Sequence, residues 1–213
     1  MSDNGEVLKL ESFPVGPLGC NCSLLWDPET GRGLVVDPGG DGAKIRRRVE
    51  TLGFKVMALL HTHAHFDHVG ATKELQDRWQ CPAHLHEGDD FLIENLDTQT
   101  GAFGMPPIPT PDMAALNAGD RFDALTTLHT PGHTPGSCCF HGGFEKGAVL
   151  LAGDTLFRRG VGRTDLWGGD FNQLEASIQG QLYGLGEGTL VIPGHGPATT
   201  IGEERAQNPF VRG

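Results

Sequence analysis

The feature that most constrains this chain is the run HTHAHFDH at residues 61–68, which directly follows the apolar segment VMALL at residues 56–60. Imidazole nitrogens and carboxylate oxygens are ligands of zinc and other first-row divalent metals, and the run contains no thiolate that would suggest a Cys-rich structural site. In an extended backbone, residues two apart point to the same side, so His63 and His65 can converge on one ion. The run therefore predicts a metal site at the end of a strand.

Beyond this run the spacing changes to that of a helix. Side chains of one helical face recur at three and four residues, at His68, Ala71, Thr72, Leu75 and Trp79. We therefore expect one amphipathic helix that begins at Asp67 and His68. The turn from strand to helix directs these two side chains away from His63 and His65, so a single motif can serve two neighbouring ions.

Composition and charge restrict the partners. The 213 residues carry a formal net charge of −11, which disfavours nucleic acid because affinity for a phosphate backbone rests on Lys and Arg. The N-terminal residues lack the regions of a secretory signal, and no apolar run approaches the roughly 18 to 20 residues of a membrane span. Five cysteines without a recognisable framework favour reduced thiols. We expect one domain over residues 1–213, located in the cytoplasm, with no membrane or nucleic-acid partner.

Strand and helix signals alternate along the chain. Apolar runs predict strands at residues 7–10, 22–26 and 33–36. An apolar stripe before Gly53 predicts one helix, and another from Leu174 to Leu185 predicts a packing helix with Asp170 as its N-cap. The segment from Glu87 to Asp120 has little periodicity, so we expect a short helix and a long surface loop there.

Three polar residues near predicted strand ends have less specific interpretations. Asp37 is either a turn-capping carboxylate or an acid that supports the metal ligands. His84 and His86 have no acidic partner pattern around them and are expected to be structural or surface residues.

The strand-end pattern of the first motif occurs three more times. Apolar runs at residues 125–128, 148–152 and 189–192 lead into glycine- or proline-containing turns that hold His133, Asp154 and His195. Open α/β architectures place their sites at strand ends, where rigid strands position the ligands. Four such strands predict that these side chains meet the first motif in one crevice.

Taken together, these segments resemble the metallo-β-lactamase superfamily. The stretches HTHAHFDH, HTPGHTPGS, LLAGDTLF, GRTD and IPGHGP occur in that order and span nearly the whole chain. The segments VVDPGG and GVGRTDLWGGD, and the ending TIGEER to NPF, are similar to the short bacterial type of glyoxalase II, a hydroxyacylglutathione hydrolase. The resemblance implies an α/β fold, a four-layer αββα sandwich of two mixed sheets flanked by helices, with metals at one edge.

The resemblance also implies roles for individual residues. His63, His65 and His133 would hold one divalent ion, Asp67, His68 and His195 a second, and Asp154 would bridge both. Zinc suits this set, and iron or manganese would also be accepted. Water shared by the two ions, with its pKa lowered towards 7, would attack the thioester carbonyl of a substrate such as S-D-lactoylglutathione. Asp67 would orient that water and take its proton.

The glutathione contacts are less well defined by the sequence. Longer glyoxalases II supply them from a C-terminal helical domain, and this sequence stops shortly after His195. We expect the contacts to come from Arg158, Arg159 or Arg163, and Arg163 in GRTD is the best candidate.

Two alternatives stay open at this level. Persulfide dioxygenases resemble the chain over GDTLFRRGVGRTD and use one iron, which His63, His133 and Asp154 would hold here. A lactonase or esterase of the same superfamily would have similar ligands. The PGHGP form around His195, the ending of the chain and the complete second ligand set favour the thioester hydrolase. Metal identity, acyl group and oligomeric state are left open.

Overall fold

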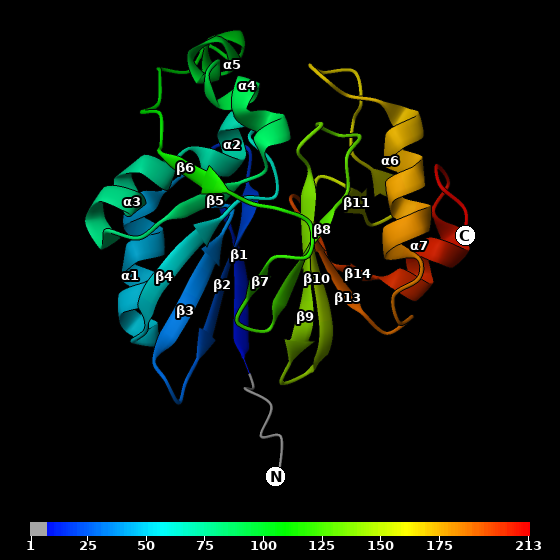
Figure 1. Ribbon diagram of the computed structural model, residues 1–213, viewed down its shortest axis with the longest axis horizontal. Helices are drawn as coiled ribbons and strands as arrows, with labels where there is room; N and C mark the ends of the chain where they lie inside the picture. Colours follow the sequence, from blue (N-terminus) through cyan, green and yellow to red (C-terminus); the bar gives the residue numbers. More distant parts are fainter. Residues whose placement is uncertain (1–7) are drawn as a thin grey trace.

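Two six-stranded sheets face each other in the computed structural model, which describes residues 8–213 (Figure 1). The first sheet follows chain order and contains β1 (Lys9–Val15), β2 (Cys20–Asp27), β3 (Arg32–Val36), β4 (Lys55–Leu60), β5 (Ala83–Leu85) and β6 (Met113–Ala115). β1 to β3 are antiparallel neighbours, whereas β3 to β6 run parallel. Of the strand predicted at residues 7–10, Val7 lies outside the described residues.

The second sheet is built from the other half of the chain. Its strand order is β14 (Thr199–Thr200), β13 (Leu190–Pro193), β10 (Gly147–Gly153), β9 (Cys138–Phe144), β8 (Leu125–His129) and β7 (Arg121–Phe122). Only the β10–β13 pair is parallel in this sheet as described, so both sheets are mixed. A small hairpin of β11 (Leu156–Phe157) and β12 (Gly160–Val161) follows β10.

Helices cover the two outer faces (Figure 1). The first sheet is covered by α1 (Gly42–Leu52) and α3 (Thr72–Trp79), and the second by α6 (Phe171–Ser177), its π-helical continuation Ile178–Leu182, and α7 (Ile201–Gln207). The expected αββα sandwich is therefore confirmed. No helix within residues 8–213 is long and apolar enough to cross a membrane.

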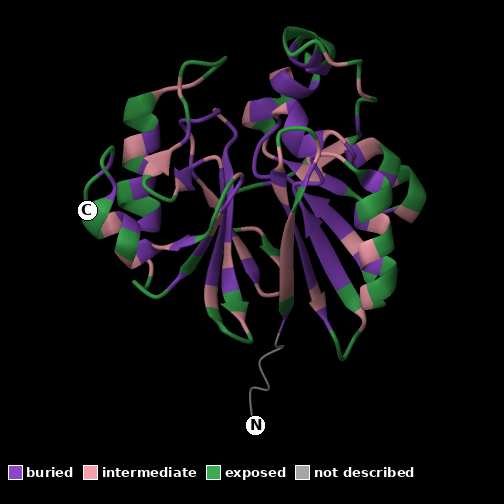
Figure 2. Ribbon diagram, turned by 180° about the vertical axis from the view of Figure 1, so that it is seen from behind, coloured by how far each residue is buried: buried purple, intermediate pink, exposed green. Residues whose placement is uncertain are grey.

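Three apolar layers hold the sandwich together. Leu34 and Val36 of β3 face the second sheet, whereas Val35 between them packs towards α1 and α3. In β10, Leu151 faces the first sheet and Leu150 packs under α6. Because these strands are buried on both faces, their sequences are continuous apolar runs instead of alternating ones. Figure 2 shows the buried residues concentrated in the strands and the exposed ones on the outer helices and turns.

The predicted helix ends agree with the structure at two places. Gly53 closes α1 in the left-handed conformation, with φ of 74°, and its N–H donates to the carbonyl of Val49. Asp170 is the N-cap of α6, where its carboxylate accepts a hydrogen bond from the N–H of Gln173 at 3.1 Å.

The prediction of one continuous helix from Asp67 to Trp79 is wrong. The structure has a short α2 (Phe66–Val69), a break at Gly70 and Ala71, and then α3. The N–H of Ala71 donates to the carbonyl of Pro38 at 2.9 Å instead of to a helical carbonyl. The neighbouring backbone also comes close, because a Cβ on Gly70 would lie 2.5 Å from the carbonyl oxygen of Gly39.

The segment from Glu87 to Asp120 has more structure than predicted. It contains a 3-10 turn (Glu87–Asp89), α4 (Asp90–Ile93) and α5 (Leu96–Ala102) before the loop that leads to β6. Leu92, Ile93 and Leu96 are buried against Ala64 and Phe66 of the histidine-rich motif. This contact, which local periodicity does not reveal, packs the short helices onto the motif.

Candidate metal centre

The sequence motifs meet at one edge of the sandwich, where strands of both sheets end. The loops after β4, β8, β10 and β13 carry, in that order, residues 61–68, His133, Asp154 and His195. The sheets are joined at this edge, because the N–H of Cys138 donates to the carbonyl of Thr62 at 2.7 Å. The fold thus brings all seven proposed ligand side chains together.

Three imidazoles form the first group. His63 Nε2 and His133 Nε2 each lie 3.0 Å from His65 Nδ1, and they lie 3.3 Å from each other. Burial, and then repulsion by neighbouring imidazoles, lowers the pKa of both His63 and His65. Both rings are therefore neutral near pH 7, which is the form that binds metals.

An aspartate and two imidazoles form the second group. His195 Nε2 lies 3.2 Å from His68 Nε2 and 3.1 Å from the carboxylate oxygen Oδ2 of Asp67. His68 is fully buried, whereas His195 is partly exposed at the mouth of the site. In each group the candidate ligand atoms lie within 4.8 Å of one another, so each group can surround one ion.

Asp154 lies between the two groups. Its Oδ1 is 3.4 Å from His68 Nε2 and 3.8 Å from His195 Nε2, and its Oδ2 is 3.7 Å from His133 Nε2. Burial by itself would raise the pKa of this carboxyl, but the adjacent imidazoles, His68 first among them, lower it below its ordinary value. Each oxygen of an ionised Asp154 thus faces a different group.

The donor set fits two divalent cations. Asp154 Oδ1 is buried and accepts no hydrogen bond, a condition that is costly for a carboxylate unless a cation is close. Several imidazole nitrogens lie within hydrogen-bonding distance of one another although neutral rings cannot all supply protons. Six nitrogen and oxygen ligands with one bridging carboxylate leave positions for water or substrate, which distinguishes a catalytic from a closed structural site.

In four of the histidines, His63, His68, His133 and His195, the ring nitrogen that faces away from the metal cluster has a hydrogen-bond partner. His133 Nδ1–H donates to the carbonyl of Arg163 at 2.7 Å, and His195 Nδ1–H donates to the carbonyl of Leu18 at 3.2 Å. A carbonyl can only accept, so both rings carry their proton on Nδ1 and turn a lone pair on Nε2 inward. Such contacts fix the tautomer and orientation of a metal-binding histidine.

Asp37 fixes one ring from each group. Its Oδ2 accepts hydrogen bonds from His68 Nδ1 at 3.0 Å and from the hydroxyl of Thr62 at 2.7 Å, and its Oδ1 accepts from the N–H of Thr62. The Thr62 hydroxyl oxygen lies 3.1 Å from His63 Nδ1 and can accept a hydrogen bond from its N–H. Of the two interpretations of Asp37, the structure favours the acid that supports the ligands.

Asp89 is a buried carboxylate that the sequence interpretation missed. Its Oδ2 accepts from the N–H of Ala64 at 3.0 Å and from the hydroxyl of Thr134 at 2.8 Å, and its Oδ1 accepts from the N–H of Gly136 at 2.7 Å. Burial raises the pKa of this carboxyl, and the hydrogen bonds only partly oppose that shift. Asp89 thus joins the loop of His63 and His65 to the loop of His133. The only local signal was an acidic residue at a helix start.

The arginines proposed for substrate lie outside the metal cluster. The guanidinium of Arg163 is exposed and donates to the carboxylate of Asp165 at 2.7 Å, and the side chain of Arg159 bonds Gln207. Arg158 is exposed. Arg163 contacts the metal cluster only through its backbone carbonyl, which accepts the hydrogen bond from His133 Nδ1–H. A contact between its side chain and substrate stays a prediction.

His84 and His86, which were expected to be structural or surface residues, do not belong to either group of candidate ligands. His84 accepts the His61 N–H at its carbonyl, and the ring of His86 stacks on His129 with centroids 4.1 Å apart. All five cysteines are free and buried. Burial raises the pKa of the Cys20 thiol to about 11, although it lies 3.5 Å from His68 Nδ1, so Cys20 is a neutral thiol behind that ring.

Comparison with known sequences identifies the family. The model of the metallo-β-lactamase superfamily matches residues 15–195. The chain is 39% identical over 213 residues to hydroxyacylglutathione hydrolase GloC of Haemophilus influenzae, with 96% of this chain and 98% of the relative covered. It is 37% identical over 212 residues to the probable metallo-hydrolase YqgX of Bacillus subtilis, with 97% and 99% covered. The chain therefore belongs to the metallo-β-lactamase superfamily, whose members bind divalent metals.

Solved structures agree with this assignment. TTHA1623 in a di-iron-bound form has a TM-score of 0.87 and 40% identity, with 94% of this chain and all of that chain covered. The BLEG-1 B3 metallo-β-lactamase also has a TM-score of 0.87, with 35% identity and coverage of 96% and 100%. ETHE1 from Myxococcus xanthus has a TM-score of 0.76 and 25% identity, with 94% and 83% covered.

Proposed function

We propose that this chain is a dinuclear metallohydrolase that cleaves a thioester such as S-D-lactoylglutathione to glutathione and a 2-hydroxy acid. The observation that carries the proposal is the position of Asp154, with one carboxylate oxygen towards each of two complete ligand groups. Similarity to a hydroxyacylglutathione hydrolase over almost the full chain supports the choice of thioester.

Two divalent ions held by these residues would polarise the substrate carbonyl and lower the pKa of water so that it attacks at neutral pH. Asp67 lies in the second group with its Oδ2 directed at His195, and it orients the attacking water and accepts its proton. The hydrogen bonds to the outer ring nitrogens of His63, His68, His133 and His195 keep the lone pairs on their Nε2 atoms directed at the metal cluster during the reaction. A thiol has an ordinary pKa of about 8.5, so the leaving thiolate needs little help from an acid.

The main alternative belongs to another reaction class. A persulfide dioxygenase would need one iron held by His63, His133 and Asp154, and these three residues also lie together in this cluster. The likeness to ETHE1 and to a di-iron structure is compatible with iron at the site. The intact second group of Asp67, His68 and His195 favours the hydrolase, because one iron would not need it.

Elemental analysis of the purified protein, together with an assay of S-D-lactoylglutathione under air and under nitrogen, separates the two activities. Close to two metals per chain with thioester cleavage that does not depend on oxygen is the expected result. One iron per chain, oxygen uptake with glutathione persulfide and no thioester cleavage would overturn it in favour of the dioxygenase. Two metals without thioester cleavage would redirect the search to lactones and other esters.

A further inference from the structure

An apolar hollow opens beside the first ligand group. Its volume is about 190 Å³, and it is lined by His65, Leu92, Thr98, Gln99, Ala102, Phe103, Leu166 and Trp167. His65 belongs both to this hollow and to the metal cluster, so a molecule bound at the metals can extend directly into it. Apart from His65 itself, the lining contains no ionisable side chain.

Two separate segments form the walls of the hollow. One wall comes from α4 and α5, which rise above the first sheet, and the other comes from the loop before α6, which rises above the second sheet (Figure 1). Large apolar side chains on both walls are left open to solvent, since Phe103 is 55% exposed, Trp167 50% and Leu166 38%. Exposed apolar groups that gather at a reaction centre indicate a ligand-binding surface.

Both walls are attached to the ligand loops. The ring of Phe103 packs on Phe66, the residue after His65, with centroids 5.0 Å apart. On the other side, a Cβ on Gly168 would lie 2.7 Å from the ring of Pro135, so the segment after Trp167 lies against the loop that carries His133. The hollow therefore has a fixed position relative to the metal cluster.

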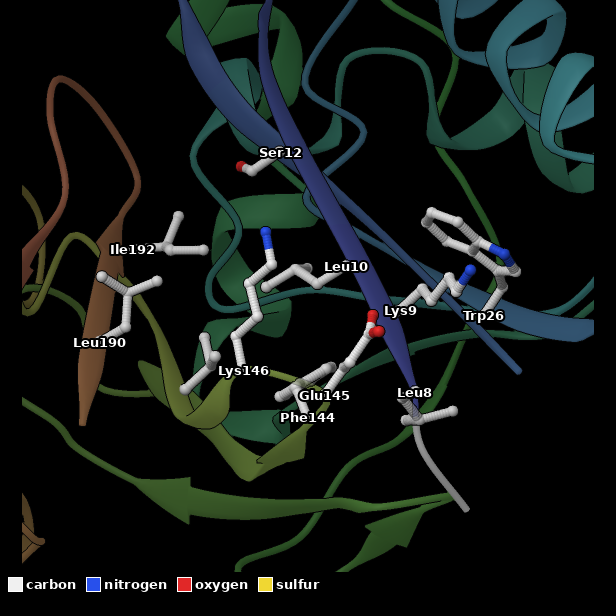
Figure 3. Close-up of a pocket in the computed structure, with 11 residues that line it drawn as sticks. Leu8, Lys9, Leu10, Ser12, Trp26, Phe144, Glu145, Lys146, Leu190 and Ile192 are labelled. Carbon is white, nitrogen blue, oxygen red and sulfur yellow. The ribbon is translucent and has the colours of Figure 1, made fainter. Parts of the chain in front are cut away.

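A second, larger hollow does not have this connection. It has a volume of about 350 Å³ and lies between β1, the β9–β10 turn and β13, from Leu8 to Ile192 (Figure 3). Lys9, Glu145 and Lys146 line it, as Figure 3 shows. β10 and β13 both run from the β9–β10 turn towards the ligands, and none of the seven candidate metal ligands is among the residues that line this hollow.

We propose that the hollow beside His65 binds an apolar acyl group of the substrate, so that the enzyme prefers thioesters whose acyl chain is several carbons long. This inference rests on the proposed thioester hydrolysis and specifies its substrate class. At about 190 Å³ the hollow is smaller than the roughly 300 to 1,000 Å³ of sites that take whole drug-sized ligands, so it suits one branch of a molecule. The thiol portion of a glutathione thioester carries charges that would lose hydration against Phe103 and Trp167, so it is the acyl portion that enters.

The main test measures kcat/KM of the metal-loaded enzyme with S-acetyl-, S-butyryl-, S-hexanoyl- and S-D-lactoylglutathione. Each buried methylene should raise kcat/KM by about fourfold until the hollow is full. The variants Phe103→Ala and Trp167→Ala should lose most of their activity on the hexanoyl substrate while they keep most of it on the acetyl substrate. Phe210→Ala removes an equally exposed phenylalanine that does not line the hollow, and it should keep the wild-type chain-length dependence.

A binding measurement separates this inference from the proposed reaction. Octanoate, titrated into the metal-loaded protein, should change the tryptophan fluorescence, and Trp167→Phe should abolish the change while the hollow stays apolar. Octanoate binding without cleavage of any thioester would overturn the thioester reaction and keep the subsite for another ester. Thioester cleavage that is independent of chain length, or a dependence that survives in both alanine variants, would overturn the subsite and leave the reaction standing.

Discussion

The metal cluster and the apolar hollow beside it differ in burial and in how their side chains are held. In the cluster, His63, His68 and His133 are buried and each ring has a hydrogen-bond partner on its far nitrogen. In the apolar hollow, Phe103 and Trp167 are half exposed, and they lie in the turn after α5 and in the loop before α6. A reaction centre needs ligands fixed to within a fraction of an ångström, whereas an apolar subsite needs only area and shape. The difference indicates that the chemistry is fixed by the sheets and the choice of substrate by the segments above them.

The strongest test of the cluster is Asp154→Ala. Loss of the carboxylate that faces both groups should reduce bound metal and lower kcat by on the order of 10³-fold or more, because the Lewis acidity at stake is worth several kcal/mol. Elemental analysis and steady-state kinetics measure both effects, with the exposed Asp77→Ala as control. Full activity with both metals present would show that Asp154 is not a ligand.

Asp37→Asn tests whether one residue orients rings in both groups. An amide has only one accepting oxygen, so the variant loses either the contact to the Thr62 N–H at Oδ1 or the contacts to His68 Nδ1 and the Thr62 hydroxyl at Oδ2. Metal affinity or activity should fall by roughly 10- to 100-fold, the usual cost of losing such a supporting partner. Chelator competition measures the affinity, and Asp120→Asn, which alters a carboxylate in the turn before β7, should have no such effect.

Asp89→Asn should have a smaller effect, mainly on stability. The amide nitrogen of the variant must face the backbone N–H of either Ala64 or Gly136, so one buried donor loses its acceptor at a cost of about 1 to 3 kcal/mol. Chemical denaturation of the metal-loaded protein measures this loss. A variant as stable as the wild type would mean that the two ligand loops hold their positions without this carboxylate.

The smallest effect is expected for Arg163→Ala, because this side chain lies outside the metal cluster and is paired with Asp165. The variant keeps the backbone carbonyl that orients His133, and the exposed ion pair with Asp165 is worth no more than about 1 kcal/mol. KM for a glutathione thioester should rise a few-fold, with kcat nearly unchanged. A larger fall in kcat than rise in KM would show that Arg163 acts on the metal cluster instead of on substrate binding.

Features that are local in sequence could be predicted, and features that depend on distant contacts could not. The apolar runs that end in His, Asp and Gly residues predicted the edge where the strands meet, and the resemblance to the superfamily implied the four layers. The break between α2 and α3 was missed because it depends on the carbonyl of Pro38, which lies far from Ala71 in sequence. Asp89 was missed for the same reason, since its partners Ala64 and Gly136 come from two other segments. The apolar hollow could not be predicted from sequence periodicity, because its residues come from α5 and from the loop before α6, which meet only in the folded protein.

The distribution of the ligands over both halves of the chain also bears on how the protein folds. His63 and His133 are separated by 70 residues, and His68 and His195 by 127. Neither sheet alone holds a complete set, so a cation can be bound by the whole group only after the two halves have docked. A bound cation then stabilises that docked state by mass action. During refolding, metal should therefore be bound only after the two halves of the chain have docked. Removal of the metal by a chelator should make the two halves separate more readily than in the metal-loaded protein.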